Sequence, residues 1–316
     1  MPPIAQHKNI AQLVLCLLTA ALLVSAHTAA ALEKSDQGHE TLLATYQRNL
    51  ARLETSSFGL PLAVDSAEIN DQIHVDVYGI FAHPFSNMVN VLQGPANWCD
   101  IVSLYPNIKA CTASDRAGAW ELTFYLGRKG YHQPQDSRPV IYRFGFMARQ
   151  EQHIEINLNT DNGPFGTKNH KMRFEALPLE GDRTFVHVSY GYRDSAALRL
   201  AAKVFFATVS RGMTGFSVTG TDKRGKPVYI GGPRGAVERS AVRYYLAIQA
   251  FLDTLHLPLE KRATSRINAW YILTSRYGKQ LLDMGKEEYL TAKTRERQNQ
   301  IKLQQQINQE PALNGR

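Results

Sequence analysis

Alternation of apolar and polar positions through the middle of the chain predicts an antiparallel β-sheet. The run QIHVDVYGIFAH at 72–83 alternates and is rich in β-branched residues, as a half-buried strand is. Six further strand-like runs follow, at 107–113, 119–128, 138–149, 153–160, 171–179 and 183–193. Turn-rich pieces such as SDRAG and DNGPFG separate them. Consecutive strands joined by short turns are typical of a meander.

The predicted hairpin around residues 149–151 shows most clearly which side chains lie on which face of the sheet. A tight connection there pairs Ala148 with Gln152, Phe146 with Ile154, Phe144 with Ile156 and Tyr142 with Leu158. One face is then apolar and aromatic, and a one-residue slip would mix it with the other. The opposite face receives Arg143, Met147, His153, Glu155 and Asn157, and we expect it to be solvated. Val188 and Tyr190 extend the apolar face on the last strand.

Helical spacing of apolar residues predicts helices around the sheet. Residues 39–54 form one apolar stripe, and two short helices divided by Gly94-Pro95 follow the first strand. The strongest pattern is Arg234–Pro258, in which Tyr244 and Ile248 belong to a broad apolar face. Such a face needs a partner, and the apolar sheet face is the obvious one.

The remaining segments are less regular. Residues 194–211 predict another helix, and the glycine-rich residues 215–233 predict a hairpin. Trp270 is among the apolar anchors of a helical segment after about residue 260. Residues 287–309 are polar on almost every side and fit either a solvated helix or a disordered segment.

The N-terminus is typical of a secretory signal peptide. Lys8 is the only formal charge before Glu33, the run Leu13–Ala26 is apolar, and small residues follow it. The run is shorter than the ~20 residues of a spanning helix, so a retained anchor is the less favoured alternative. We therefore expect an exported protein, periplasmic or secreted after cleavage of this segment.

Export bears on the cysteines. Cys16 lies within the signal segment, so the mature chain keeps Cys99 and Cys111, which an oxidising compartment lets pair. A disulfide is the favoured interpretation, with two buried free thiols, or a reactive or metal-binding role, as alternatives. A zinc site has little support because the two cysteines do not have CxxC spacing and have no histidine close to them in the sequence.

The charge is modestly basic. The chain of 316 residues has a formal net charge of +8, with mild basic clusters at 221–227 and 292–298. Zinc-finger, RNP and basic heptad motifs are missing from the sequence, so nucleic acid is not an expected partner. An exported basic protein more often meets anionic lipid or polysaccharide, which predicts peripheral contact with an anionic membrane surface.

The order of elements resembles the START-like superfamily, also called the helix-grip fold or polyketide cyclase/lipid-transport group. The resemblance covers Ile69–Pro258 and rests on element order and the double-helix break at 84–104, without a fingerprint motif. It implies an α+β fold in which a curved antiparallel sheet of about seven strands wraps the long C-terminal helix. A cavity for an apolar ligand would lie between sheet and helix, and a Cys99–Cys111 bridge would pin the helical lid to the sheet edge.

The sequence departs from the family pattern at 194–233, where about 40 residues separate the last strand from the long helix. Either a helix and a hairpin are inserted there, or the first of the two helices is the one that the sheet grips. The resemblance also assigns candidate ligand contacts to Trp98, Tyr142, Phe144, Phe146, Ile156, Val188, Tyr190, Tyr244 and Ile248. A filled interior would use the same residue types, so core packing remains an alternative for all of them.

The sequence contains no GxSxG, HExxH or P-loop motif, and we name no catalytic residue, metal ligand or cofactor. We expect a signal peptide at 1–31, a helix at 33–58, a START-like domain at 60–258, a helical appendage at 259–295 and a polar helix or disordered tail at 296–316. The favoured function is non-catalytic binding or transport of an apolar or lipid-like small molecule. The alternatives are a cyclase- or hydrolase-type enzyme on the same scaffold, and an envelope protein-interaction module with an exposed apolar stripe near Trp270.

Overall fold

The computed structural model describes residues 38–149, 152–195 and 212–313, and the chain divides into two compact units, 1–47 and 48–316. In the first unit, residues 38–47 are helical, and Thr45 Oγ1 donates to the carbonyl of Thr41 at 2.8 Å. In the second unit, residues 48–54 are helical and precede the sheet. The predicted signal peptide and most of the helix predicted at 194–211 lie outside the described residues.

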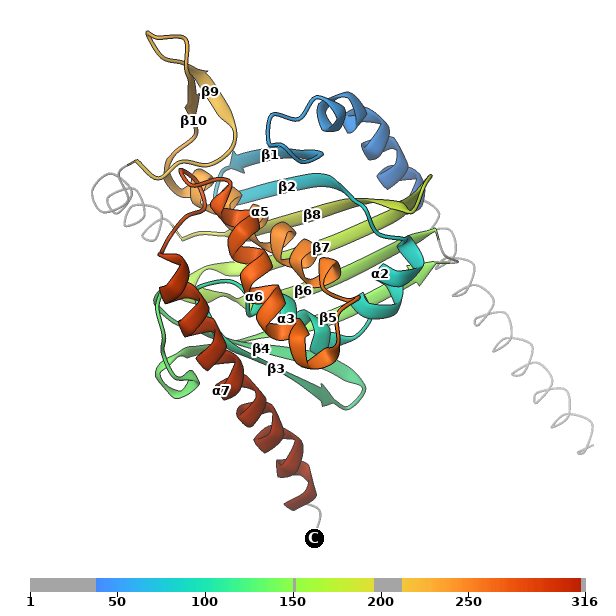
Figure 1. The fold of residues 1–316 in the computed structure, drawn as a ribbon, viewed down its shortest axis with the longest axis vertical. Coiled ribbons are helices and arrows are strands. Elements are labelled where there is room, and N and C mark those ends of the chain that lie inside the picture. The colour runs from blue at the N-terminus through green and yellow to red at the C-terminus, as the bar shows by residue number, and fades with distance from the viewer. Residues whose placement is uncertain (1–37, 150–151, 196–211, 314–316) are drawn as a thin grey trace, which may run out of the picture. The chain divides into compact units, whose positions relative to one another are not determined.

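The second unit is built on one curved antiparallel sheet, coloured from blue to yellow-green in Figure 1. Its strands are β1 (Leu62–Ile69), β2 (Gln72–Phe81), β3 (Ile108–Arg116), β4 (Ala119–Leu126), β5 (Arg138–Arg149), β6 (His153–Asn162), β7 (Lys168–Leu179) and β8 (Arg183–Arg193). Their order is β1-β2-β8-β7-β6-β5-β4-β3. The predicted meander and α+β class are confirmed. Strand β1 is an eighth strand beyond the seven that we expected. Its second half is mostly exposed and polar, so the sequence does not show the alternation of a half-buried strand there.

The predicted faces of the β5–β6 hairpin are confirmed, but the predicted register is wrong by two residues. Ala148 pairs with Ile154 rather than Gln152, and Phe146 pairs with Ile156. A shift of two leaves every side chain on its own face, because the period of a strand is two residues. The opposite face is less solvated than expected, since His153 is only 1% exposed.

Helix α5 (Gly232–Asp253) is the helix that the sheet grips, and it lies across the inner face of the sheet in Figure 1. It therefore follows the inserted hairpin rather than preceding it. Tyr245 packs on the ring of Phe81 with centroids 4.9 Å apart. A Cβ at Gly79 would lie 2.1 Å from the Tyr245 hydroxyl, so the helix approaches β2 at a distance that only glycine permits.

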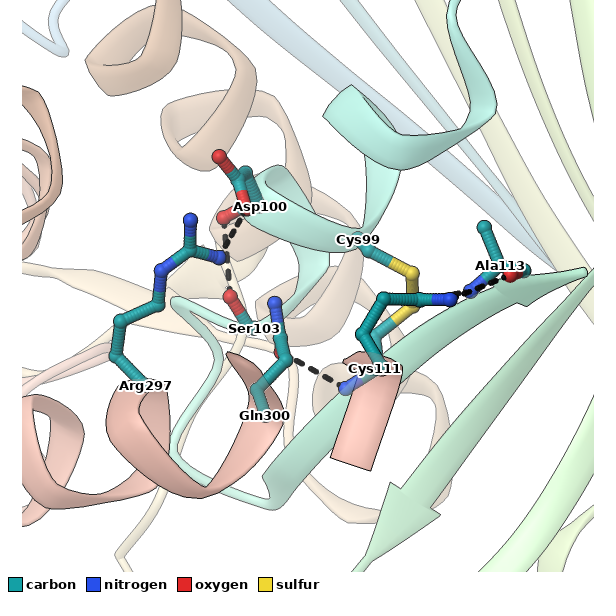
Figure 2. Close-up of a disulfide and its surroundings, with 8 residues drawn as sticks. Cys99, Asp100, Ser103, Cys111, Ala113, Arg297 and Gln300 are labelled. Carbon is teal, nitrogen blue, oxygen red and sulfur yellow. Dashed lines mark hydrogen bonds and ion pairs between the residues drawn. A yellow bond between two sulfur atoms is a disulfide. The ribbon is translucent and has the colours of Figure 1, made fainter. Parts of the chain in front are cut away.

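Two short helices, α2 (Phe85–Leu92) and α3 (Pro95–Val102), link β2 to β3 as predicted. Trp98 of α3 is buried, and its Nε1 donates to the carbonyl of Leu92 at 2.7 Å. The predicted disulfide between Cys99 and Cys111 is confirmed, with the two Cα atoms 4.9 Å apart. It fastens α3 to the edge strand β3, as Figure 2 shows.

Helix α6 (Leu259–Ser275) packs against α5. Trp270 is 2% exposed, its Nε1 donates to the carbonyl of Arg243 at 3.2 Å, and its ring stacks on Tyr289 with centroids 5.0 Å apart. The apolar stripe near Trp270 is therefore covered within the described part of the chain.

Helix α7 (Lys286–Leu313) lies along the edge strand β3. Gln300 Oε1 accepts from the main-chain N–H of Cys111, and Gln304 Oε1 accepts from that of Ala113, both at 2.8 Å. The Gln304 amide also donates to the carbonyl of Ala113 at 2.9 Å. Two residues along a strand and four along a helix both advance about 6 Å, so successive glutamines meet successive outward main-chain groups. Figure 2 shows Gln300 and the β3 residues at this edge.

A buried ionic cluster fixes the start of the same contact. Glu296 of α7 accepts from Lys109 Nζ at 3.0 Å and from Lys293 Nζ at 2.6 Å, and all three side chains are at most 4% exposed. Lys109 Nζ also donates to the carbonyls of Pro106 and Gly130. Lys293 Nζ also donates to the carbonyl of Ile108. Polar residues that fit a solvated helix in the sequence are therefore buried where α7 meets the sheet edge.

A second, two-stranded sheet is formed by β9 (Val218–Thr221) and β10 (Pro227–Tyr229), which confirms the predicted hairpin. Within residues 38–149, 152–195 and 212–313, no helix has the length and apolar character that a bilayer span requires.

Candidate functional site

A cavity of about 600 Å³ lies between the inner face of the large sheet and the N-terminal half of α5. Its walls come from β4, β5, β7, β8, α5 and the connections next to them. The lining residues are Tyr105, Asn107, Phe124, Leu126, Gly127, Arg128, Asp136, Arg138, Tyr142, Pro164, Thr167, His170, Tyr190, Tyr192, Ala236, Val237, Ser240 and Tyr244. This volume is in the range of small-molecule sites.

Aromatic rings form most of the wall. Phe124 and Tyr142 stack with centroids 4.5 Å apart, and Tyr105 and Tyr244 stack at 5.3 Å. Tyr190 bridges toward Tyr244 at 5.9 Å. These rings offer flat apolar faces with hydroxyl groups at their ends, which suits a ligand that is apolar but carries a few polar atoms.

His170 of β7 is the main titratable group of the wall. Thr167 Oγ1 donates to the carbonyl of Pro164 at 2.6 Å, so its own proton is used. The 2.6 Å contact between Thr167 Oγ1 and His170 Nε2 is therefore a hydrogen bond that the imidazole N–H donates. This leaves the lone pair of Nδ1 facing the Tyr190 hydroxyl at 3.4 Å.

Burial lowers the pKa of His170 to about 4, so the imidazole is neutral near pH 7. A Cβ at Gly163 would lie 2.2 Å from the His170 ring, so only glycine leaves space for the ring in this position. The arrangement holds one neutral imidazole whose Nδ1 accepts a long hydrogen bond, at 3.4 Å, from the Tyr190 hydroxyl.

The hydroxyl groups of Tyr142, Tyr190 and Tyr244 are kept protonated by burial. Burial raises the pKa of Tyr142 and of Tyr244 above the usual tyrosine range. Burial also raises the pKa of Tyr190, to which the neighbouring Tyr142 contributes. The interior therefore favours neutral polar atoms, because a charged group would be desolvated without an opposite charge beside it.

Charged side chains are confined to the rim of the cavity. Arg128, Asp136 and Arg138 line it from the β4–β5 connection and the start of β5, and all three are exposed. A ligand with one charged or strongly polar end could keep that end among these groups and leave its apolar part inside.

The sequence-derived ligand residues divide into wall and core. Tyr142, Tyr190 and Tyr244 line the cavity. Four others belong to the filled core next to it, namely Trp98, Ile156, Val188 and Ile248. Phe144 and Phe146 are half-buried and pack against that core. The interior is thus hollow near the start of α5 and filled around Trp98, Ile156, Val188 and Ile248.

Sequence reasoning missed His170, although a signal for it exists. His170 alternates in phase with Met172 and Phe174 along β7, and all three are buried. A histidine in register with apolar core positions points to the same face as they do. Phe124, Tyr105 and Tyr192 were also missed, because their strand and loop positions do not separate cavity wall from core.

A second group of ionisable side chains lies on the outer face of the sheet. His187 Nε2 is 2.7 Å from Asp76 Oδ1, and His187 Nδ1 is 2.9 Å from Glu175 Oε2. Both ring nitrogens therefore donate to carboxylates, and the imidazole is doubly protonated. Burial opposes this charge, but the two carboxylates outweigh it and raise the pKa of His187.

The carboxylates respond in the opposite direction. Burial favours the protonated form of Glu175, but the 3.6 Å contact with His153, the hydrogen bond from His187 and the nearby charge of Arg173 outweigh it and lower its pKa to about 2. The cluster thus resembles a structural ion-pair network more than an open site. Among the residues that the structure describes, no group of histidine, cysteine and acidic side chains is arranged to hold a metal ion.

Comparison with known proteins found similarity only at the level of structure. No protein-family model matches the sequence, and no curated protein sequence matches it. A STAR-related lipid transfer protein from Xanthomonas axonopodis is 13% identical with a TM-score of 0.33, over 47% of this chain and 89% of that one. The human StAR-related lipid transfer protein 5 is 10% identical with a TM-score of 0.33, over 70% and 100%. An aromatase/cyclase from Streptomyces is 12% identical with a TM-score of 0.31, over 66% and 95%.

TM-scores of this size carry no argument about what the chain does. The START-like helix-grip assignment therefore rests on the arrangement of the elements. Two short helices link β2 to β3, an antiparallel meander follows, and the sheet curves around α5. The fold is a START-like helix grip with an added strand β1, an inserted hairpin and two further C-terminal helices.

Proposed function

We propose that the aromatic cavity binds an apolar or amphipathic small molecule, and that the chain is a non-catalytic binding or transport protein for it. The observation that supports this most is the cavity itself, with about 600 Å³ of space walled by aromatic rings. Burial of apolar ligand surface contributes about 25 cal/mol per Å², so ~300 Å² would supply roughly 7 kcal/mol before the costs of association. Lipid-like molecules with a flat or ring-containing body fit the stacked walls best.

We further propose that the protein works outside the cytoplasm. The apolar N-terminal run with its small-residue exit and the Cys99–Cys111 disulfide both support export. An exported carrier would take an insoluble ligand through an aqueous compartment, shielded by the sheet and α5.

The test is identification of a ligand and competition for its space. Protein purified from its exporting host is analysed by native mass spectrometry and by solvent extraction, and an apolar fluorescent probe measures binding to the emptied cavity. Ala236→Phe places a ring in the cavity from α5, whereas Ala67→Phe makes the same change at an exposed position of β1. We expect Ala236→Phe to reduce probe binding at least tenfold and Ala67→Phe to leave it unchanged. Equal binding by all three proteins, with no extracted ligand, would reject the proposal.

A cyclase- or hydrolase-type enzyme is the second candidate, and His170 is the specific observation that favours it. A substrate that displaced the 3.4 Å hydrogen bond between Tyr190 and His170 could give a proton to the unprotonated Nδ1 and receive a hydrogen bond from the Tyr190 hydroxyl at a developing negative charge. His170→Gln separates the two functions. If the protein is an enzyme, this substitution would abolish turnover of the extracted molecule or its close analogues. If the protein is a carrier, the wild type would show no turnover and the substitution would change ligand affinity only modestly.

The third alternative, a protein-interaction module, receives less support. Its expected sign was an exposed apolar stripe near Trp270, and that side chain is buried beneath Tyr289.

A further inference from the structure

The β9–β10 hairpin stands clear of the eight-stranded sheet, at the upper left of Figure 1. Every residue from Val218 to Val228 is exposed. A two-stranded hairpin is only marginally stable by itself in water, so one held in this position needs support at its base.

The support comes from Glu238 of α5, which is 0% exposed. Its carboxylate accepts from the main-chain N–H groups of Phe216 and Ser217 at 2.6 and 2.9 Å, and from Ser217 Oγ at 2.7 Å. The same carboxylate accepts from Ser66 Oγ of β1. A buried carboxylate with these partners clamps the hairpin base onto both α5 and the sheet.

The tip of the hairpin concentrates positive charge. Lys223, Arg224 and Lys226 lie in the turn, and within the described part of the chain none of them forms an ion pair. Asp222, the one acidic residue there, accepts from the main-chain N–H groups of Arg224 and Lys226 at 2.8 and 2.9 Å. Its carboxylate is thus engaged in shaping the turn rather than in pairing with the cationic side chains.

Exposed apolar side chains accompany these cations. Val218 is 59% exposed and Val228 is 43% exposed, one on each strand of the hairpin. Cations at the tip and exposed valines behind them are the combination that a phospholipid interface accommodates, with phosphates for the cations and the upper acyl region for the valines.

We propose that this hairpin is a membrane-docking element, and that its partner is an anionic phospholipid bilayer. The base of the hairpin adjoins the first turns of α5, and Ala236 and Val237 of those turns line the cavity. A bilayer bound at the tip would therefore lie on the same end of α5 as the cavity. Docking does not depend on what the cavity holds, so it can fail or succeed independently of the proposed ligand binding.

The experiment is vesicle co-sedimentation with the full mature chain. Vesicles of phosphatidylcholine alone are compared with vesicles in which about a third of the lipid is phosphatidylglycerol. The hairpin variant carries Lys223→Gln, Arg224→Gln and Lys226→Gln. The matched control carries Lys171→Gln, Lys286→Gln and Lys302→Gln, which are exposed lysines elsewhere with the same total change in charge.

We expect the wild-type chain and the control to bind the anionic vesicles and to release them as salt is raised. The hairpin variant should lose on the order of a hundredfold in partitioning at low salt, since each cation near an anionic surface contributes about a fivefold factor. Equal loss in the control would show that only net charge matters and would overturn the proposal. Failure of the wild type to bind vesicles while it binds a soluble anionic polysaccharide would overturn it as well.

A second measurement does not rely on loss of binding. Val228→Trp introduces an interfacial reporter on β10, and its emission should shift to shorter wavelength when anionic vesicles are added. A matched Ile141→Trp on the exposed face of β5 should not shift. An unshifted Val228→Trp in a chain that still sediments with vesicles would place the contact elsewhere and reject the hairpin as its site.

Discussion

The contact between α7 and β3 predicts that two glutamines protect the edge of the sheet. Replacing Gln300 and Gln304 with leucine keeps the approximate shape of both side chains and removes their amide groups. The main-chain N–H groups of Cys111 and Ala113 then lose the acceptors that lie at 2.8 Å. Water reaches this contact poorly, because Gln300 is only 4% exposed.

The magnitude follows from the cost of an unsatisfied donor. Each buried N–H left without an acceptor costs about 1–3 kcal/mol, so two cost roughly 2–6 kcal/mol. The leucines recover part of this through apolar burial, which leaves an expected loss of about 2–4 kcal/mol. At about 2–4 °C per kcal/mol for a domain of this size, the melting temperature should fall by roughly 5–15 °C.

The assay is thermal unfolding followed by circular dichroism, with light scattering recorded in parallel. The same helix supplies a matched control, because Gln305 and Gln306 are exposed. Gln305→Leu with Gln306→Leu makes the same chemical change without touching β3. The Gln300/Gln304 variant should also scatter light at lower temperature, since an uncovered edge strand can pair with other chains. Equal melting temperatures for the two double variants would refute the reasoning.

Three further predictions concern the helix contacts. Glu296→Gln leaves Lys109 and Lys293 buried without a counter-charge and should cost about 3–5 kcal/mol in denaturant unfolding, more than Lys293→Met, which still leaves Lys109 paired. Burial, opposed by Glu296, lowers the pKa of Lys293 from 10.5 to about 8 in the folded protein. Between pH 8 and pH 10.5, Lys293 is therefore protonated in the unfolded chain and mostly deprotonated in the folded one. Wild-type stability relative to Lys293→Met should therefore rise as pH increases from about 8 to 10 and stay level below 8, and a difference that falls over this range would contradict the sign. Gly79→Ala sets a methyl group 2.1 Å from the Tyr245 hydroxyl and should cost about 1–3 kcal/mol, part of which Tyr245→Phe should restore in the double variant; no recovery would mean that the strain lies elsewhere.

The sheet and its gripped helix could be predicted because period and element order carry that information. Seven of the eight strands and α5 lie where their patterns predict them. The β5–β6 register could not be predicted as well, because a shift by two residues keeps Phe146 and Ile156 on the apolar face. The odd or even position of a residue along a strand fixes the face on which its side chain lies. The length of the turn fixes which residues pair, and turns of several lengths fit the residues around 149–152.

The candidate site was only partly predictable for a related reason. Tyr142 lines a cavity and Ile156 lies in a filled core, yet both are inward-facing residues of adjacent strands. Whether space remains between a sheet and a helix depends on the sum of many side-chain volumes, which a pattern of apolar positions does not contain. His170 could have been found from its phase with Met172.

Helix α7 shows a different limit. The part of α7 that packs on β3 buries polar residues, because its partner there is the polar main chain of an edge strand. A search for apolar stripes therefore predicts a solvated helix in this segment. A signal was nevertheless present, since Glu296, Gln300, Gln304 and Asn308 recur at intervals of four residues.

The glutamine contacts also set an order of events during synthesis. Cys111 and Gln300 are separated by 189 positions in the chain, and β3 leaves the ribosome long before the helix that covers it. Until the last segment has been made, the growing protein presents an open strand to its surroundings. We therefore expect the nascent chain to need a holding factor in the compartment where it folds, and a version that stops before residue 300 to be cleared rather than accumulate.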